Sequence, residues 1–338
     1  MKEIKSVLIT GGAGYVGSAL VPKLLDKGYH VKVLDLYIYG DNIFDVFKAH
    51  PDLEEIKGDI RDQGLLEKRL KNCDAVIHLA CISNDPTFEL NPALSRSINY
   101  TAFEPLVRIS KESGVKRFIY ASTCSVYGIS DKESVTEEHP LLPITDYNKY
   151  KGLCEPILLK YQSPEFTTVV IRPATVCGYS PRQRFDLTVN ILTNHAYNVN
   201  RIKVFGGSQT RPNIHIEDIT DLYCELLEFS CEKVAGKTFN AGYENCAVGD
   251  LAELVGAVMA RECPEKGRPE ITMLPSGDRR SYRISSEKIK EELGFVPRRT
   301  IEDAVADLIR AFKSGKFPNS MEDKRYYNIK TMQAIKLV

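Results

Sequence analysis

The chain has 338 residues, of which 43% are hydrophobic and 27% are charged, and its 45 basic residues balance its 45 acidic residues. This composition is typical of a globular protein with about two domains, and a net charge of zero excludes a chain-wide field that would attract nucleic acid or an anionic membrane. No stretch of about 18 apolar residues offers a membrane span, and the apolar run in the opening MKEIKSVLITGG is too short for a signal peptide.

Nine cysteines are scattered through the chain, and none of them forms a Cys-x-x-Cys pair. An odd number of dispersed cysteines favours reduced thiols over a disulfide framework or a zinc site. We therefore expect a cytoplasmic protein without a metal site and without nucleic-acid or membrane partners.

The first half of the chain alternates short β-branched runs with amphipathic stretches. The runs predict buried strands, and the stretches between them have helical spacing. This alternation is typical of an α/β protein with a doubly wound parallel sheet of Rossmann type. The predicted strands are Ser6–Thr10, His30–Asp35, Ala75–Ala80, Arg117–Ala121 and Thr167–Arg172, and the predicted helices include Gly17–Lys27 and Leu65–Lys71.

The alternation of predicted strands and helices ends near Gly178, and the sequence after it is rich in loops with isolated helical stretches. We therefore expect residues 1–177 to form the dinucleotide-binding sheet domain and residues 178–338 to form mainly a smaller mixed α/β domain for the substrate. A segment near 237–242 is expected to return to the sheet domain. The later predicted helices are Asp218–Phe229, Val248–Met259, Ser286–Leu293 and Ile301–Lys313.

A glycine-rich turn joins the first predicted strand to the first predicted helix. Its glycines at positions 11, 14 and 17 allow a tight turn, close approach of the backbone to a diphosphate, and close packing of helix on strand. A glycine turn that only caps a βα unit is the alternative interpretation. The strand before and the helix after these glycines favour a dinucleotide site at the helix N-terminus.

The second predicted strand ends at Asp35, whose carboxylate can accept hydrogen bonds from an adenosine ribose. The same carboxylate would repel a 2′-phosphate, and the next residues, Leu36, Tyr37 and Ile38, supply no arginine to bind one. The sequence therefore favours NAD over NADP as the cofactor.

A series of further motifs follows in order over nearly the whole chain. The complete series is TGGAGYVG at 10–17, GDIRD at 58–62, HLA at 78–80, INY at 98–100, STCSVYG at 122–128, Tyr-x-x-x-Lys at 147–151, IRPATVCG at 171–178 and RPNIHIEDI at 211–219. With these motifs in this order, the chain resembles the extended short-chain dehydrogenase/reductase family, which contains the nucleotide-sugar epimerases and dehydratases.

The resemblance implies that Tyr147 and Lys151 are the catalytic pair, and their spacing is compatible with this role, because residues four apart on a helix project from one face. The resemblance implies that Tyr147 exchanges a proton with a sugar hydroxyl, and that the Lys151 ammonium and a cationic nicotinamide favour the phenolate. It also implies that the hydroxyl of Thr123 holds the same substrate oxygen. Tyr326 and Lys330 share the spacing but lie in the polar tail.

The helix that carries Tyr147 also contains Pro156. A proline inside a helix lacks the backbone N–H and clashes with the preceding turn. We therefore expect this helix to kink or to end early, beyond the turn that holds Tyr147 and Lys151.

The resemblance implies a set of cofactor contacts. Asp59 and Ile60 would flank the adenine, Leu79 and Ala80 would lie along the diphosphate and ribose, and Asn99 would steady the neighbouring backbone or a water. Purely structural roles for the last three residues are equally open. The expected NAD contacts are Gly11, Gly14, Tyr15, Val16, Gly17, Asp35, Asp59, Ile60, Leu79, Ala80, Asn99, Tyr147, Lys151 and Ala174.

The second domain is expected to bind the nucleotide diphosphate of a sugar substrate. Arg211 and Arg280 match family positions that clamp a diphosphate, which suits the forked guanidinium. Arg182 and Arg184 are less secure, because arginines in a polar loop are usually solvated. His215 is expected to fix the domain junction rather than to act in catalysis. The expected substrate contacts are Thr123, Thr175, Asn190, Arg184, Arg211 and Arg280.

Family dehydratases carry Asp-Glu directly after the catalytic threonine, whereas Cys124 and Ser125 stand there in this chain. Dehydration is therefore disfavoured, and Cys124 is expected to be a buried thiol rather than an acid or base. An NAD-dependent nucleotide-sugar 4-epimerase, acting by transient oxidation at C4, needs only Thr123, Tyr147, Lys151 and bound NAD.

The enzyme alternative is a nucleotide-sugar C4-dehydrogenase or keto-sugar reductase, for example on a GDP-heptose-type substrate. The run Ser180–Leu187 resembles that of some heptose-nucleotide C4-dehydrogenases. A dinucleotide sensor without activity would require loss of catalytic residues that this chain retains. The family resemblance also implies a homodimer, formed by the helix bearing Tyr147 and by the segment around Pro92–Ser113.

Overall fold

A seven-stranded parallel sheet forms the larger unit of the computed structural model, which describes residues 4–130, 132–277 and 281–335. The strand order is β10-β6-β5-β4-β1-β2-β3, so the chain runs outward from β1 in both directions. This is a doubly wound Rossmann arrangement, which confirms the predicted fold class. The strands are β1 Ser6–Thr10, β2 His30–Asp35, β3 Leu53–Lys57, β4 Ala75–His78, β5 Arg117–Ala121, β6 Thr167–Pro173 and β10 Lys237–Ala241.

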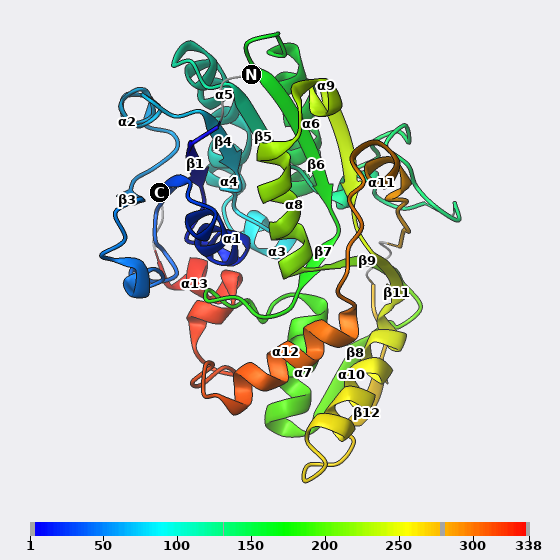
Figure 1. The fold of residues 1–338 in the computed structure, drawn as a ribbon. Coiled ribbons are helices and arrows are strands. Elements are labelled where there is room, and N and C mark those ends of the chain that lie inside the picture. The colour runs from blue at the N-terminus through cyan, green and yellow to red at the C-terminus, as the bar shows by residue number, and fades with distance from the viewer. Residues whose placement is uncertain (1–3, 131, 278–280, 336–338) are drawn as a thin grey trace.

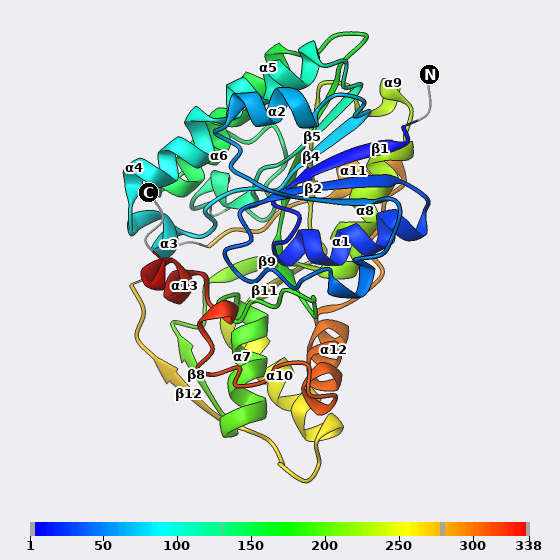
Figure 2. The same cartoon turned by 90° about the vertical axis from the view of Figure 1, so that its left-hand side faces the viewer.

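Helices cover both faces of this sheet (Figure 1, Figure 2). Alternate residues of β1 serve the two cores: Val7 and Ile9 pack on the side of α1 and α8, and Leu8 packs on the side of α2, α5 and α6. Both faces are therefore apolar, as the continuous β-branched runs predict. The helices of this unit are α1 Tyr15–Asp26, α2 Gln63–Arg69, α3 Asp85–Glu89, α4 Pro92–Arg96, α5 Phe103–Glu112, α6 Asp146–Lys160, α8 Ile216–Glu228, α9 Cys231–Val234 and α11 Glu287–Leu293.

The smaller unit lies beside the carboxyl ends of the large sheet and contains two small sheets (Figure 1). In one sheet β9 pairs antiparallel with β11 and parallel with β7, and in the other β8 pairs parallel with β12. Mixed pairing confirms the expected mixed α/β character. The elements are β7 Thr175–Cys177, β8 Arg201–Phe205, β9 Thr210–His215, β11 Glu244–Ala247, β12 Glu270–Leu274, α7 Thr188–Val199, α10 Val248–Glu262, α12 Ile301–Lys313 and α13 Asn328–Ala334.

Segments that follow residue 178 return to the larger unit. Strand β10 pairs with β6 along the edge of the large sheet, in the segment where a return is expected. Helix α8 packs against α1, and α11 packs against β10. Later parts of the chain thus contribute to the larger unit. The assignment of residues 1–177 to the cofactor and of residues 178–338 mainly to the substrate remains a prediction.

Helix α6 runs without interruption from Asp146 to Lys160, although Pro156 lies inside it. The expectation that Pro156 ends the helix early is therefore wrong. The proline removes only the hydrogen bond to the carbonyl of Gly152. Burial of Cys154 and Leu158 against the large sheet holds the last turns in place.

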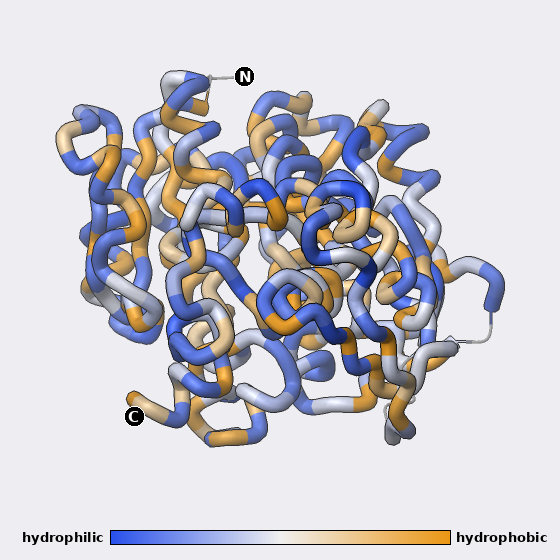
Figure 3. Tube along the Cα trace, turned by 90° about the horizontal axis from the view of Figure 1, so that it is seen from below, coloured by the Kyte–Doolittle hydropathy of each residue, from blue (hydrophilic) through white to orange (hydrophobic). Residues whose placement is uncertain are grey.

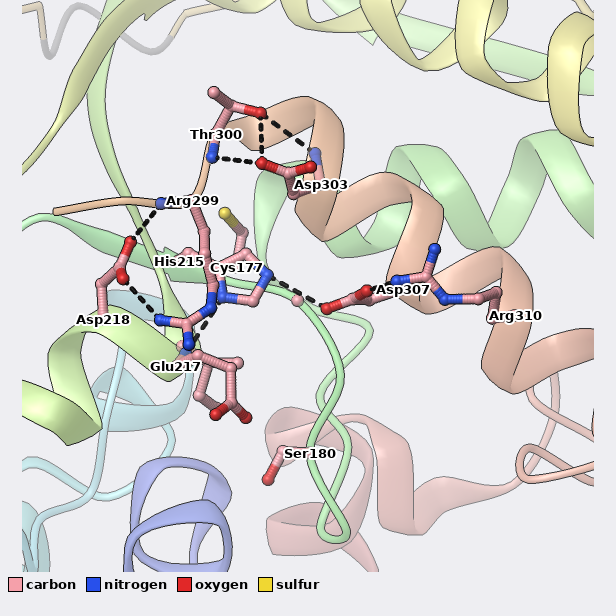
Figure 4. Close-up of polar contacts among 12 residues, drawn as sticks. Cys177, Ser180, His215, Glu217, Asp218, Arg299, Thr300, Asp303, Asp307 and Arg310 are labelled. Atoms are coloured by element: carbon pink, nitrogen blue, oxygen red, sulfur yellow. Dashed lines mark hydrogen bonds and ion pairs between the residues drawn. The ribbon is translucent and has the colours of Figure 1, made fainter. Parts of the chain in front are cut away.

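His215 lies at the junction between the two units (Figure 4). Its Nδ1 accepts a hydrogen bond from the backbone N–H of Glu217 at 3.0 Å, and its Nε2 lies 3.3 Å from an oxygen of Asp307 in α12. Nearby, Asp218 of α8 pairs with Arg299 at 2.7 Å, just before α12 begins. These contacts fasten α8 to α12, and His215 does not line the cleft described below.

Polar and apolar residues interleave along the trace throughout the molecule (Figure 3). Among the described residues, no helix is both long enough and apolar enough to span a membrane. The same part of the chain contains no cluster of three or more histidine, cysteine or acidic residues suited to a metal ion.

Candidate active site

A cleft opens at the carboxyl ends of β1, β2, β4 and β5, where the loops that follow these strands converge. Ligand sites in doubly wound sheets lie at this edge, beside the strand at which the chain reverses its direction of winding. Of the residues expected to bind cofactor or substrate, those that line the cleft are Gly11, Gly14, Tyr15, Val16, Gly17, Asp35, Asp59, Ile60, Leu79, Ala80, Tyr147, Lys151 and Arg184.

The glycine loop forms a close-fitting cradle at one end of the cleft. Gly11 has a φ of +74°, and a Cβ there would lie 2.6 Å from the backbone nitrogen of Ala80. A Cβ at Gly17 would lie 2.4 Å from the carbonyl oxygen of Gly12, so the helix can approach the strand only at glycine. Helix α1 begins directly after Gly14, and its N-terminus therefore offers free N–H groups to an anion.

Two carboxylates line the cleft near the glycine loop, Asp35 at the end of β2 and Asp59 just after β3. Asp35 accepts hydrogen bonds from the backbone N–H of Ala13 at 3.0 Å and of Tyr37 at 2.9 Å, which fix its orientation, while burial raises its pKa. Asp59 pairs with Arg61 at 2.7 Å. Burial disfavours its charge, but the hydrogen bonds from Arg61 hold the pKa of Asp59 below its usual value. Among the residues that the structure describes, Asp35 forms no ion pair, so its carboxylate is available to the hydroxyls of a ribose.

Tyr147 and Lys151 lie on consecutive turns of α6, and both line the cleft. The ammonium of Lys151 donates to the carbonyl oxygen of Ala121 at 2.5 Å and lies 4.9 Å from the centre of the Tyr120 ring. The ring of Tyr147 meets Phe88 edge-on, with 6.5 Å between ring centres. The end of β5 thus positions the lysine, and α3 positions the tyrosine.

Burial raises the pKa of Tyr147 well above its ordinary value, and the guanidinium of Arg184 opposes this shift. The phenol is therefore neutral in this structure. The sequence predicts Lys151 as the cation that favours the phenolate of Tyr147. In the structure, the positive charge of Arg184 favours it as well. Ionisation of Tyr147 requires these charges together with any positive charge on a bound ligand.

Thr123 stands just beyond the strand end that contributes Ala121 and Ser122 to the cleft. Its hydroxyl lies 2.8 Å from that of Ser125, which in turn donates to the side-chain oxygen of Asn148 on α6. This chain of polar groups connects the β5 loop to the first turn of the Tyr147 helix. Thr123 itself is not part of the cleft lining, and its contact with a substrate remains a prediction.

Cys124 is a buried thiol. Its sulfur donates to the carbonyl oxygen of Arg172 at 2.8 Å, and burial raises its pKa well above the ordinary value. A thiol of this kind is neutral and has its proton engaged, so it is unsuited to act as an acid or base.

Asn99 and Asn190, two residues of the predicted ligand set, have hydrogen-bond partners within the protein. Asn99 accepts from the backbone N–H of Ile82 at 2.8 Å and donates to its carbonyl at 2.9 Å, so it steadies the backbone that lines the cleft. Asn190 donates to the hydroxyl of Tyr15 and to the carbonyl of Arg184, and it is fully buried. These bonds occupy both N–H groups of the Asn190 amide, which therefore supports the wall of the cleft rather than facing into it.

The remaining predicted residues lie toward the smaller unit. Ala174 is buried, Thr175 begins β7, and the guanidinium of Arg211 in β9 donates to the carbonyl of Thr210 at 3.2 Å. None of the three lines the cleft. Arg280 lies outside the described residues, so its expected diphosphate contact stays a prediction.

Sequence reasoning missed several residues that line the cleft. Tyr39, Cys81, Asn328 and Met332 contribute to it, and the last two belong to α13 near the end of the chain. Cys81 directly follows the HLA motif, which could have drawn attention to it. Asn328 lies between Tyr326 and Lys330, whose spacing does not point to a ligand contact at Asn328, so only the fold reveals its position.

Arginines in a polar loop are usually solvated, whereas Arg182 and Arg184 are buried. Their exposed fractions are 4% and 9%, and both guanidinium groups line the cleft. Helix α13 packs on the loop that carries them. The side chain of Asn328 accepts a hydrogen bond from Arg182, and the backbone N–H of Asn328 donates to Asp186 at 3.1 Å.

Comparison with protein families matches residues 7–242 to the NAD dependent epimerase/dehydratase family. The chain is 28% identical to a UDP-glucose 4-epimerase of Lactobacillus helveticus, over 94% of this chain and 99% of that protein. It is 27% identical to a dTDP-glucose 4,6-dehydratase of an Actinoplanes species, over 92% of this chain and 98% of that protein.

Solved structures give the same picture. Pal from Bacillus thuringiensis superimposes with a TM-score of 0.81 at 25% identity, covering 91% of this chain and 99% of that one. The dTDP-glucose 4,6-dehydratase DesIV from Streptomyces venezuelae, solved with NAD and TYD bound, gives a TM-score of 0.79 at 25% identity, covering 92% and 98%. Epimerases and dehydratases are thus similar to this chain to nearly the same degree.

Proposed function

Because the chain belongs to the NAD-dependent epimerase/dehydratase family of extended short-chain dehydrogenases/reductases, we propose that it is a nucleotide-sugar 4-epimerase that acts by transient oxidation at C4. One observation carries the proposal: Tyr147 and Lys151 face the cleft beside the glycine loop, while the positions after Thr123 hold Cys124 and Ser125 instead of acids.

The residues of the cleft fit NAD. A Cβ at Gly11 would clash with the backbone of Ala80, so the turn can follow this course only with glycine, and it leads directly into the N-terminus of α1, where a diphosphate can bind. Asp35 lies at the end of β2, where its carboxylate suits a ribose with free hydroxyls and disfavours a 2′-phosphate. When bound, NAD supplies the acceptor that takes a hydride from C4 and later returns it.

Tyr147 performs the proton transfer in this proposal. In its phenolate form it removes the proton of the C4 hydroxyl as C4 is oxidised, and it gives the proton back when C4 is reduced. Lys151 stabilises the phenolate by charge and is itself positioned by Ala121. Thr123 donates a hydrogen bond to the same substrate oxygen, which orients the C4 hydroxyl toward Tyr147. Inversion then requires the keto-sugar to present its other face before reduction.

Dehydration needs an acid and a base at C5 and C6, which Cys124 and Ser125 do not provide. Cys124 is buried with its proton engaged by Arg172, and the Ser125 hydroxyl is bonded to Asn148. A 4,6-dehydratase activity is therefore disfavoured, although such enzymes are among the relatives of this chain.

A one-way C4-dehydrogenase or keto-sugar reductase, for example on a GDP-heptose-type substrate, is the second candidate. The run Ser180–Leu187, whose two arginines face the cleft, favours it. The same Tyr147 and Lys151 would serve either reaction. The two differ in whether the sugar is released as a ketone or retained until C4 is reduced.

The experiment that tests the proposal uses UDP-, dTDP-, GDP- and CDP-sugars that carry deuterium at C4. The purified protein is incubated with each, and the products are followed by NMR together with the absorbance of reduced nicotinamide. A 4-epimerase gives a C4-inverted product that keeps the deuterium at C4, without accumulation of reduced cofactor. Accumulation of reduced cofactor with a keto-sugar would support the dehydrogenase, and loss of oxygen from C6 would support a dehydratase.

The protein is further proposed to be a cytoplasmic homodimer that meets its partner through α5 and α6. Leu153 of α6 is 41% exposed, and Ile157 lies one turn further along the same helix. An apolar side chain at this position suits a helix-to-helix contact. Light scattering of the purified protein and of Leu153→Glu tests this: a dimer that becomes a monomer supports it, and a monomeric wild type contradicts it.

A further inference from the structure

The loop from Ser180 to Leu187 brings two buried arginines to the cleft. Arg182 and Arg184 are 4% and 9% exposed, and both line the cleft together with Gly11 and Gly14. An arginine buried to this degree in a loop is uncommon unless it is paired. The arrangement therefore calls for a partner for each guanidinium.

The loop is fastened to the first turns of α1. The hydroxyl of Ser180 donates to the carbonyl of Tyr15 at 2.6 Å, and the backbone N–H of Arg182 donates to the hydroxyl of Ser18 at 3.0 Å. The arginines are therefore held beside the helix N-terminus on which a diphosphate would lie. These buried hydrogen bonds from Ser180 and Arg182 to α1 fix the position of the loop.

The two guanidinium groups have incomplete partners within the protein. Arg184 donates to Asp186 at 2.9 Å. Arg182 donates to the neutral amide of Asn328 and lies 3.6 Å above the ring of Tyr39, and within the described residues it forms no ion pair. In the same part of the chain, Nε of Arg182 and Nη2 of Arg184 are buried without a hydrogen-bond acceptor.

A buried guanidinium with unused donors indicates an anionic ligand. Burial lowers the pKa of Arg182 to about 10, so the group still carries its charge at neutral pH. Leaving such a charge unpaired at a buried position is costly, and phosphate oxygens match the forked donors of arginine.

We propose that Arg182 and Arg184 bind the diphosphate of the dinucleotide beside the glycine loop, and that Asn328 of α13 positions Arg182 for this contact. The inference rests on the proposed binding of NAD. It assigns Arg184 to the cofactor, whereas the sequence resemblance implied the substrate. It also gives the C-terminal helix a role in holding the cofactor.

The surroundings of Arg182 favour the cofactor over the nucleotide sugar. Tyr39 follows β2, and the charge of Arg182 also acts on Asp35 at the end of that strand. Both belong to the half of the cleft expected to hold the adenosine. A 2′-phosphate is the other anion that could lie there, but the fixed carboxylate of Asp35 would repel it.

Contacts from the two arginines predict slow release of the cofactor. The diphosphate would be bound by the N-terminus of α1 and two guanidinium groups, so release would break charged hydrogen bonds to both arginines. Retention of the cofactor through the reaction suits an enzyme that returns the hydride to the same sugar.

The test measures NAD binding by titration calorimetry to protein freed of cofactor, for the wild type, Arg182→Gln, Arg184→Gln and the control Arg201→Gln. Arg201 is an exposed arginine paired with Glu270 on β8 and β12. Each cleft variant is expected to weaken NAD binding about ten- to a hundredfold, the range for a charged hydrogen bond, and the control is expected to bind as the wild type does. UDP, dTDP, GDP and NADP are titrated in parallel.

The outcomes separate this inference from the proposed function. Wild type that does not bind NAD would contradict the proposed function itself. Wild type that binds NAD, with Arg182→Gln and Arg184→Gln binding equally well, would overturn only the arginine contact. Loss of nucleoside diphosphate binding with unchanged NAD binding would assign the arginines to the substrate, and loss of NADP binding alone would assign Arg182 to a 2′-phosphate. Either result contradicts the proposal.

Two further variants guard against misfolding. Arg182→Lys keeps the charge but loses the forked donors. Asn328→Ala removes the amide that accepts from Arg182 and donates to Ser83. Both are expected to bind NAD more weakly than wild type, with Asn328→Ala less affected than Arg182→Gln, and to dissociate from reduced NAD faster in stopped flow. Circular dichroism and the Tm of the cofactor-free proteins confirm folding. Folded variants with wild-type affinity and dissociation rate would overturn the proposal.

Discussion

The ammonium of Lys151 donates a hydrogen bond to the carbonyl oxygen of Ala121, the last residue of β5, at 2.5 Å. The large sheet thus holds the lysine one helical turn from Tyr147, on the same face of α6. Lys151 acts on the phenol through its charge rather than through a hydrogen bond to it in this structure. That relationship leads to a prediction about pH.

Lys151→Met is expected to lower turnover and to move the acid limb of the rate profile to higher pH. Burial already raises the pKa of Tyr147, so loss of a nearby positive charge raises it further and leaves less phenolate at neutral pH. The profile of kcat against pH checks this. Lys149→Met is the matched control, because Lys149 is exposed on the same helix. A profile of Lys151→Met that is lower but unshifted would contradict the electrostatic role.

Thr123→Val is expected to reduce kcat about a hundred- to a thousandfold, the usual effect of losing one positioned donor at the reacting oxygen. Thr123→Ser keeps the hydroxyl and its contact with Ser125, which is 2.8 Å away, and should retain most activity. Steady-state kinetics and the Tm of both variants are compared. Equal loss in the two variants would indicate that Thr123 has a structural role in its turn instead of contact with substrate.

Glu155→Gln is expected to destabilise the protein by about 3 to 5 kcal/mol, because it leaves a buried charge on Arg172 without a counter-ion. The two side chains are 4% and 7% exposed and 2.6 Å apart, and they fasten α6 to β6. Urea unfolding measures the change. Glu112→Gln, which breaks an exposed pair with Arg108 in α5, should change the free energy of unfolding by about 0.5 kcal/mol or less. Similar losses in both variants would contradict the argument.

The free energy of unfolding is expected to fall as pH decreases from about 6.5 toward 3, in part through His78. Burial lowers its pKa to about 3, while its unfolded value is about 6.5. The unfolded chain therefore binds a proton that the folded chain excludes, which costs up to about 1.4 kcal/mol per pH unit in this window and nothing above it. Unfolding of the wild type and of His78→Gln, followed against pH, checks this. An unchanged slope in the variant would assign the acid sensitivity to other groups.

The parallel sheet and the cofactor loop were predictable because their signals are local. The β-branched runs of β1, β2 and β5 are buried on both faces, and the glycines of the first turn are required by contacts within one βα unit. Strands β8 and β12 gave no such signal. Polar and apolar residues alternate at the start of β8, RIKVF, but five residues are a short pattern in a loop-rich part of the sequence.

Helix α7 was missed because its sequence, TVNILTNHAYNV, is rich in Asn, Thr and β-branched residues. Such residues have low helix propensity, and the helix depends on packing against α10 and α12. The buried state of Arg182 was missed for a related reason. It depends on α13, which lies more than a hundred residues further along the chain. The sequence around Arg182 does not indicate that this distant helix packs on it.

The most direct test of the central claim compares C4 inversion by the wild type, Tyr147→Phe and Tyr150→Phe across the panel of UDP-, dTDP-, GDP- and CDP-sugars, with NAD affinity measured on the same preparations. Tyr150 lies on the same helix, where it stacks on Phe88, and serves as the control. The account predicts that Tyr147→Phe loses at least about a hundredfold in kcat while it still binds NAD, and that Tyr150→Phe stays close to the wild type. Tyr147→Phe that inverts C4 at the wild-type rate would contradict the account.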